Sequence, residues 1–174
     1  MTTKTVSQVS DFTYIQTHSG WVYTAFIIDV FSRAIVGWKV STRMNTDMVL
    51  DALEQALHDR GMPKNVIHHS DRGVQYLSIR YTNRLEAANL RASVGTTGDS
   101  YDNALAETVN GLYKTEVIEY LKADWQGLAD VQLATLNWVD WFNKERVHSA
   151  LGYVSPFDFE AMYYDKINPL GQVA

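Results

Sequence analysis

The order of strand-like and helix-like patterns is the feature that most constrains the fold of this chain. Three runs rich in β-branched and aromatic residues come first, at 9–17, 21–31 and 34–41, and only short turns separate them. Consecutive strands joined by short turns form an antiparallel meander. We therefore expect the chain to open with three antiparallel strands.

After these runs, strand-like and helix-like patterns alternate. Short apolar runs at 66–69 and 90–94 are typical of strands. Helical spacing of apolar residues or helix-forming composition marks five further segments, at 49–57, 78–89, 103–121, 128–144 and from the Ser155-Pro156 cap onward. This order predicts an α/β fold with a mixed five-stranded sheet flanked by helices, and it is typical of ribonuclease-H-like folds.

The length of 174 residues fits one ordinary domain with short appended parts. We expect an N-terminal extension at 1–9, a ribonuclease-H-like core at 10–123, and C-terminal helices at 124–174 that pack on the core. No run approaches the length of a membrane span, and the first ten residues lack the apolar core of a signal peptide. The expectation is a soluble intracellular protein that makes no membrane contact.

The composition excludes several kinds of chemistry. The chain contains no cysteine, which rules out disulfides, thiolate zinc sites, iron–sulfur clusters and a cysteine nucleophile. Lys and Arg total 15 against 20 Asp and Glu, so the formal charge is −5. This balance argues against a chain that holds DNA mainly by bulk electrostatic attraction, and it permits a site where several carboxylates bind a divalent metal.

Three carboxylates stand in positions that need an explanation. Asp11 lies inside the first strand, Asp71 lies just past the strand at 66–69, and Glu107 lies near the start of a long helix. Each has an ordinary explanation when taken alone: a sheet-edge position, turn chemistry before a glycine, and a favourable place in the helix dipole. Together they suggest a site for two Mg²⁺ ions, because hard cations prefer oxygen ligands and two ions can catalyse phosphodiester chemistry.

The helix that carries Glu107 has two distinct faces. At about 100° per residue, one face collects Leu105, Val109 and Leu112 and is expected to pack on the core. The opposite face collects polar and small residues, namely Asn103, Glu107, Asn110, Gly111 and Lys114. Glu107 is therefore expected to point away from the packed side of its helix.

Five stretches of the sequence resemble the catalytic core of orfB-type insertion-sequence transposases, which belong to the retroviral-integrase-like D,D,E superfamily. These stretches are DFTYI from Asp11, FIIDVFSRAIVGW at 26–38, HHSDRGVQYLS at 68–78, GDSYDNALAET at 98–108 and WFNKERVHSALGYVSP at 141–156. Asp71 and Glu107 are separated by 35 residues, the spacing that this family shows between its second and third carboxylates. The resemblance extends from about residue 10 to residue 163.

The resemblance implies a DNA transposase or integrase core, a D,D,E polynucleotidyl transferase. Asp11, Asp71 and Glu107 would be its catalytic residues and metal ligands, with two Mg²⁺ ions expected and Mn²⁺ as a substitute. The activity would be phosphodiester cleavage at transposon ends and strand transfer by the freed 3′-hydroxyl. The implied partners are transposon-end and target DNA, and the chain would form a homo-oligomer on DNA, near the bacterial nucleoid.

The resemblance also suggests DNA contacts. Lys114 and Asn103 match DNA-contacting positions of the superfamily, and 95–102 matches its mobile active-site loop. Arg72 follows the second carboxylate and has two explanations, a phosphate contact and a local salt bridge. Family members usually carry a further N-terminal region of helix-turn-helix character, and this chain begins about ten residues before Asp11. We therefore expect the part that recognises element ends to be absent.

Two alternatives to the active transposase core stay open. The chain could be a catalytically silent transposase remnant that acts as an interaction or inhibitor module. It could instead be a ribonuclease-H-type nuclease that cleaves RNA–DNA hybrids. The five matching stretches favour the transposase.

Several other residues have side chains that could bind metal or DNA, but a role in packing or turn formation explains each of them better. Adjacent histidines in an extended strand face opposite ways, so His68 and His69 are not expected to bind one ion together. Asp29 is expected to hydrogen-bond to the Ser32-Arg33 turn that follows it. Trp138 and Trp141 are expected to pack in the core, and Asp99 and Asp102 to serve as turn and cap residues.

Overall fold

The computed structural model describes residues 7–61, 66–70, 79–93, 99–120 and 124–167. Its strands form one five-stranded sheet in the order β3-β2-β1-β4-β5. Their bounds are Ser7–Thr17 for β1, Gly20–Asp29 for β2, Ile35–Ser41 for β3, Ile67–Ser70 for β4 and Arg91–Ser93 for β5. The first three strands pair antiparallel, and β4 and β5 extend the sheet in parallel. The predicted meander and the mixed five-stranded sheet are both confirmed.

The helices follow the predicted order. They are α1 at Thr46–Asp59, α2 at Ile79–Ala87, α3 at Asp99–Tyr113, α4 at Leu128–Lys144 and α5 at Pro156–Ile167. A π-helical turn, η1 at Lys114–Glu119, continues α3, and a short 3₁₀ turn, η2 at Ser149–Leu151, precedes α5. The predicted caps are present, because Asn45 accepts a hydrogen bond from the Met48 N–H and Ser155 accepts one from the Asp158 N–H.

The start of α3 differs from the prediction. The segment 95–102 was expected to be a loop, but the helix already begins at Asp99. The sequence there is Asp99-Ser100-Tyr101-Asp102, and aspartate and serine are favoured in turns and also in the first turn of a helix. The composition alone therefore did not decide between these two structures.

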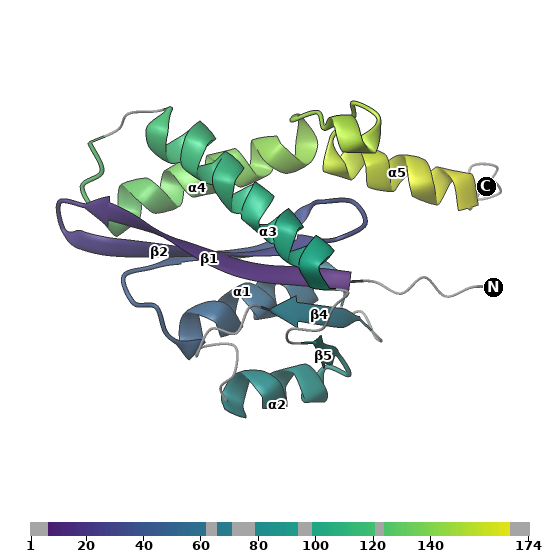
Figure 1. Cartoon of the computed structure of the whole chain (residues 1–174), viewed down its shortest axis with the longest axis horizontal. Coiled ribbons are helices and arrows are strands. Elements are labelled where there is room, and N and C mark those ends of the chain that lie inside the picture. Colours follow the sequence, from purple (N-terminus) through teal and green to yellow (C-terminus); the bar gives the residue numbers. More distant parts are fainter. Residues whose placement is uncertain (1–6, 62–65, 71–78, 94–98, 121–123, 168–174) are drawn as a thin grey trace.

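The helices cover the sheet on both faces, as Figure 1 shows. On one face α3 packs on β1 and α4 on β3, in a core shared with β2 and η1 that includes Phe26, Tyr113 and Trp138. On the other face α1 and α2 pack on Ala25, Ile27 and other strand residues. Residues 25–28 of β2 are buried on both sides, which explains why this run of the sequence is continuously apolar.

The C-terminal helices contact the rest of the molecule through specific polar contacts as well as apolar packing. The carboxylate of Glu160 on α5 accepts hydrogen bonds from the Ser32 hydroxyl at 2.5 Å and from Arg60 Nη2 at 2.7 Å. The side chain of Asn143 on α4 bonds to both the N–H and the carbonyl of Ile35 on β3. The boundaries proposed for the core and the C-terminal segment remain a prediction.

No helix in the described part of the chain is long and apolar enough to cross a membrane.

Candidate active site

The first catalytic candidate, Asp11, lies where β4 ends beside β1. Among the described residues, the two strands pair in parallel from Ser7 opposite Ile67 to Ser10 opposite Ser70. Asp11 follows Ser10 on β1 and therefore lies at the carboxyl end of the described part of β4, which is where α/β sheets commonly place ligands. Asp71, the residue after Ser70 in sequence, lies outside the described residues, and so does Arg72.

The carboxylate of Asp11 is held at both of its oxygens. The Phe12 N–H donates to Oδ1 at 2.8 Å, and the Asn110 Nδ2 amide donates to Oδ2 at 2.9 Å. Asn110 belongs to α3, which lies across β1 in Figure 1. This contact joins residues 99 apart in sequence and fixes the first candidate carboxylate against the helix that carries the third.

Glu107 and Lys114 flank Asn110 on the same helix face. Glu107 lies one turn before Asn110, Lys114 lies one turn after it, and both side chains are exposed. The Nζ atom of Lys114 is 5.8 Å from the centroid of the Tyr14 ring on β1. Leu105 and Val109 on the opposite face are buried, so the predicted orientation of the helix is confirmed.

Asn110 and Asn103 both belong to the predicted polar face of α3. Asn110 is 8% exposed, because it lies at the contact with β1 rather than in solvent. The backbone of Asn103 is helical, but its side chain lies outside the description. Its predicted DNA contact therefore stays a prediction.

The oxygen atoms gathered here are of the kind that a hard cation prefers. The carbonyl oxygen of the Asn110 side chain is buried and has no hydrogen-bond partner among the described residues, although its amide is bonded to Asp11. A buried unpaired oxygen costs free energy, and a cation or an additional donor would relieve that cost. The donor set of Asp11, Glu107 and Asn110 therefore fits Mg²⁺ in chemical type. The described residues alone form no group of three metal-binding side chains, and Asp71 lies outside them.

The residues that sequence analysis set aside have structural roles. His68 is fully buried, and its ring bonds through Nε2 to the Tyr81 hydroxyl at 2.5 Å and through Nδ1 to Gln8 at 3.4 Å. Asp29 accepts hydrogen bonds from the N–H groups of Phe31 and Ser32, as predicted for the turn between β2 and β3. The side chain of His69 lies outside the description.

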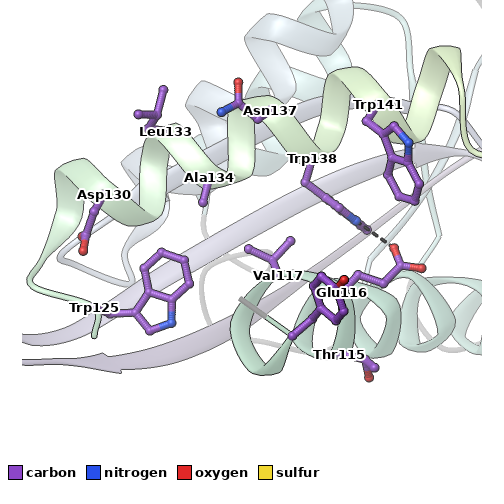
Figure 2. Close-up of a pocket in the computed structure, with 11 residues that line it drawn as sticks. Thr115, Glu116, Val117, Trp125, Asp130, Leu133, Ala134, Asn137, Trp138 and Trp141 are labelled. Carbon is purple, nitrogen blue, oxygen red and sulfur yellow. Dashed lines mark hydrogen bonds between the residues drawn. The ribbon is translucent and has the colours of Figure 1, made fainter. Parts of the chain in front are cut away.

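The prediction that both helix tryptophans pack in the core was correct only for Trp138. Trp138 is buried, and its Nε1 donates to Glu116 at 2.8 Å, whereas Trp141 is 41% exposed. Trp141 lines a groove of about 790 Å³ between η1 and α4, at the end near Glu116 (Figure 2). The surface of this groove is mostly apolar, so it does not provide a phosphate-binding site.

Sequence analysis missed two features of the candidate site. It placed Asn110 on the Glu107 face but assigned it no role, although the spacing of three residues from Glu107 was visible. It also gave no role to Tyr14 and Trp21, whose exposed rings lie 5.4 Å apart near Lys114. The sequence signal for a role of Tyr14 was its position three residues after Asp11. The contact of Tyr14 with Trp21 could not be predicted, because it depends on the register of β1 and β2.

The chain belongs to the integrase core domain family. One family model with this description matches residues 7–100, and a second with the same description matches 88–156. These matches confirm the resemblance identified from the sequence.

Curated relatives are insertion-sequence transposases. The chain is 56% identical over 159 residues to the transposase for insertion sequence element IS629 of Shigella sonnei, covering 91% of this chain and 53% of that protein. It is 52% identical over 161 residues to a putative transposase for IS986/IS6110 of Mycobacterium tuberculosis, covering 90% of this chain and 58% of that protein. The chain thus spans between half and three fifths of the length of these relatives.

Solved structures of retroviral integrases share the fold. The magnesium complex of the HTLV-2 integrase catalytic core domain, in its trimeric form, matches with a TM-score of 0.70 at 17% identity, covering 88% of this chain and 94% of that chain. The simian T-cell lymphotropic virus intasome, in complex with PP2A regulatory subunit B56 gamma, matches with a TM-score of 0.74 at 17% identity, covering 88% and 53%. The ribonuclease-H-like fold predicted from the element order is confirmed.

Proposed function

We propose that this chain is the catalytic core of a DNA transposase, a metal-dependent polynucleotidyl transferase. The observation that carries the proposal is the hydrogen bond from Asn110 to Asp11, which anchors the Glu107 face of α3 beside the end of β4. This hydrogen bond joins the strand that carries Asp11 to the helix that carries Glu107, in a member of the integrase core domain family. The high identity to insertion-sequence transposases supports DNA as the substrate.

Asp11, Asp71 and Glu107 would hold divalent metal, with two Mg²⁺ ions expected and Mn²⁺ as a substitute. When bound, the metal supplies activation of the attacking oxygen and neutralisation of charge on the leaving oxygen. The Phe12 N–H and the Asn110 amide keep both oxygens of Asp11 in a fixed orientation before the substrate arrives. Such preorganisation lowers the reorganisation needed during the reaction.

The DNA would lie along the exposed face of α3. Lys114 would pair with a backbone phosphate, and Asn103 and Arg72 would add contacts near the bond that is cut. Water would first attack the phosphodiester at a transposon end and release a 3′-hydroxyl. That hydroxyl would then attack a phosphodiester of the target DNA, so that one bond forms as another breaks. Two or more copies of the chain would act together on paired ends, in the bacterial cytoplasm.

A cleavage assay with matched variants tests the proposal. The substrate is a branched DNA that mimics the strand-transfer product, incubated with Mg²⁺ or Mn²⁺. We expect Asp71→Asn and Glu107→Gln to lower turnover by about a hundredfold or more, because each removes charge at the reacting centre. Glu119→Gln, an exposed glutamate on η1, serves as the matched control and keeps full activity.

Two results would replace the proposal. If wild-type turnover is no greater than that of Asp71→Asn, the chain is a silent remnant. If RNA–DNA hybrids are cleaved faster than DNA is nicked, the chain is a ribonuclease-H-type nuclease.

A further inference from the structure

An exposed pair of aromatic side chains lies at the end of the first β-hairpin. Tyr14 on β1 is 59% exposed and Trp21 on β2 is 49% exposed, and their rings meet edge to face with centroids 5.4 Å apart. The strand register places Trp21 opposite Gln16, two residues from Tyr14. The two rings are therefore diagonal neighbours on one face of the sheet.

The hairpin end that carries this pair is anchored to the rest of the molecule. The backbone N–H groups of His18 and Ser19 donate to the carbonyls of Trp125 and Gln126 at 2.9 and 3.0 Å. The Thr17 hydroxyl donates to the Gly20 carbonyl at 2.6 Å within the turn. A fixed backbone under two aromatic rings means that little conformational entropy is lost when a ligand stacks on them.

The aromatic pair lies beside Lys114, a residue of the helix face that carries Glu107. Tyr14 follows Asp11 by three residues on β1, roughly 10 Å along an extended strand, so the two side chains point to opposite faces of the sheet. The Nζ atom of Lys114 lies 5.8 Å from the Tyr14 ring centroid, and Lys114 is one helical turn beyond Asn110. Lys114 thus approaches the Tyr14 ring on one side of β1 and shares a helix face with Asn110, which bonds to Asp11 on the other.

We propose that Tyr14 and Trp21 bind an unpaired DNA base, which stacks on the face of one ring and meets the other ring at its edge, while Lys114 contacts the phosphate of the same strand. This inference rests on the proposed function, because it takes DNA as the ligand of the candidate active site. Aromatic side chains stack on any base whose face is free, whereas both faces of a base inside a duplex are already covered. The ligand is therefore a single-stranded stretch of DNA that passes Lys114.

A binding assay that separates paired from unpaired DNA tests the inference. The probes are a fluorescein-labelled duplex with a short single-stranded thymidine overhang and the blunt duplex of the same sequence, both without divalent metal so that no cleavage occurs. We expect Tyr14→Ala and Trp21→Ala each to weaken overhang binding by about fivefold to a hundredfold, the range for loss of one stacked base. Binding of the blunt duplex should change by less than about twofold, a difference well under 1 kcal/mol.

Two further variants sharpen the assay. Tyr14→Phe keeps the ring and loses only the hydroxyl, so it should bind the overhang as wild type does. Trp141→Ala removes an equally exposed tryptophan from the groove between η1 and α4 and should leave binding unchanged.

Several results would overturn the inference. The first is overhang binding by Trp21→Ala that equals that of the wild type. The second is an equal loss of affinity for the blunt and the overhang DNA in the variants. The third is a wild-type protein that binds neither probe. A wild-type dimer that Trp21→Ala converts to a monomer, with overhang binding unchanged, would assign the pair to contact with a second copy.

The cleavage assay is independent of this measurement. Intact metal-dependent nicking with normal overhang binding by Trp21→Ala overturns only the stacking inference. If the alanine variants lose only overhang binding and the wild type shows no nicking, the stacking inference is supported and only the proposed enzyme activity is overturned.

Discussion

At the scale of single residues, Asn110 links the two elements that carry the candidate active site. Its amide donates to Asp11 on β1, and its own backbone lies on α3 between Glu107 and Lys114. Hydrogen bonds to a metal-binding carboxylate fix its orientation, and their loss typically lowers metal affinity or activity by about 10–100-fold. Asn110 is thus a positioning residue under the proposed function.

We predict that Asn110→Ala lowers both Mn²⁺ affinity and DNA nicking by about 10–100-fold, because Asp11 loses the hydrogen bond that the Asn110 amide donates to it from α3. Titration calorimetry with Mn²⁺ measures the first effect without turnover. Asn137→Ala removes an exposed asparagine from α4 and is the matched control. Equal Mn²⁺ affinity in the two variants would contradict the positioning role.

At the scale of elements, a chain of buried hydroxyls joins β2, α3 and α4. The Tyr113 hydroxyl lies 2.7 Å from Thr135 Oγ1 and 3.2 Å from Thr24 Oγ1, and Thr135 itself donates to the Val131 carbonyl at 2.7 Å. Tyr113 therefore donates to Thr135, and Thr24 donates to Tyr113. Burial is the main cause that raises the pKa of Tyr113 above its ordinary value, against a smaller lowering by these two hydrogen bonds.

We predict that Tyr113→Phe lowers the free energy of unfolding by about 1–3 kcal/mol at neutral pH, because Thr24 loses its acceptor in a buried site. Guanidinium unfolding measures this loss. Thr108→Val, at an exposed threonine of α3, is a control that should change stability less.

The pH dependence of Tyr113→Phe has a definite sign. The folded state holds the Tyr113 proton more tightly than the unfolded state, so its contribution is complete below the ordinary tyrosine pKa of about 10. It is lost as the pH rises through the higher folded pKa. The decline of stability above pH about 10 should therefore be shallower in Tyr113→Phe than in the wild type, and parallel profiles would contradict this account.

Close packing between β3 and α1 depends on a glycine. A Cβ atom at Gly37 would clash with the Ala52 carbonyl oxygen and lie 3.0 Å from the Ala56 Cβ on α1. We predict that Gly37→Ala destabilises the protein by about 1–3 kcal/mol through overpacking. Gly111→Ala is the contrasting variant, because its Cβ would meet open space on α3 and should raise stability by roughly 0.5–1 kcal/mol. Thermal unfolding of both variants compares the two, and equal Tm values would contradict the packing argument.

At the scale of the whole molecule, the candidate site exists only in the folded chain, because its residues come from separate parts of the sequence. A metal that binds the folded state alone stabilises it, by about 2.7 kcal/mol at a hundred times its Kd. We predict that Mg²⁺ or Mn²⁺ raises the Tm of the wild type by about 5–10 °C at that concentration.

The same melting experiment identifies the residues that bind the metal. Asp11→Asn and Glu107→Gln should remove most of the shift, and Glu119→Gln should retain it. A wild-type Tm that does not respond to either metal, or an equal response in Glu107→Gln, would contradict the proposed ligand set.

The order of the elements and the orientation of α3 could be predicted from the sequence because both are local properties. Apolar residues recur with the period of the element that buries them, so Leu105 and Val109 marked the packed face of α3. The first turn of α3 was missed, since Asp99 and Asp102 suit a loop and a helix start equally well. The exposure of Trp141 was missed because a wide apolar surface does not reveal which part the neighbours cover.

By itself, the sequence determined the ribonuclease-H-like fold, the family, and which carboxylates are the candidates for catalysis. The fold class follows from periodicity and element order, and the family and the carboxylate set from the resemblance of five stretches to known transposase cores, all of which are fixed along the chain. Only the tertiary structure decided that Asn110 bonds to Asp11, that Tyr14 pairs with Trp21, and that Lys114 lies beside them. The contacts of Asn110 and Lys114 join residues that are distant in sequence and depend on the docking of α3 on β1, and the Tyr14–Trp21 pair depends on the register of the hairpin, which no local pattern encodes.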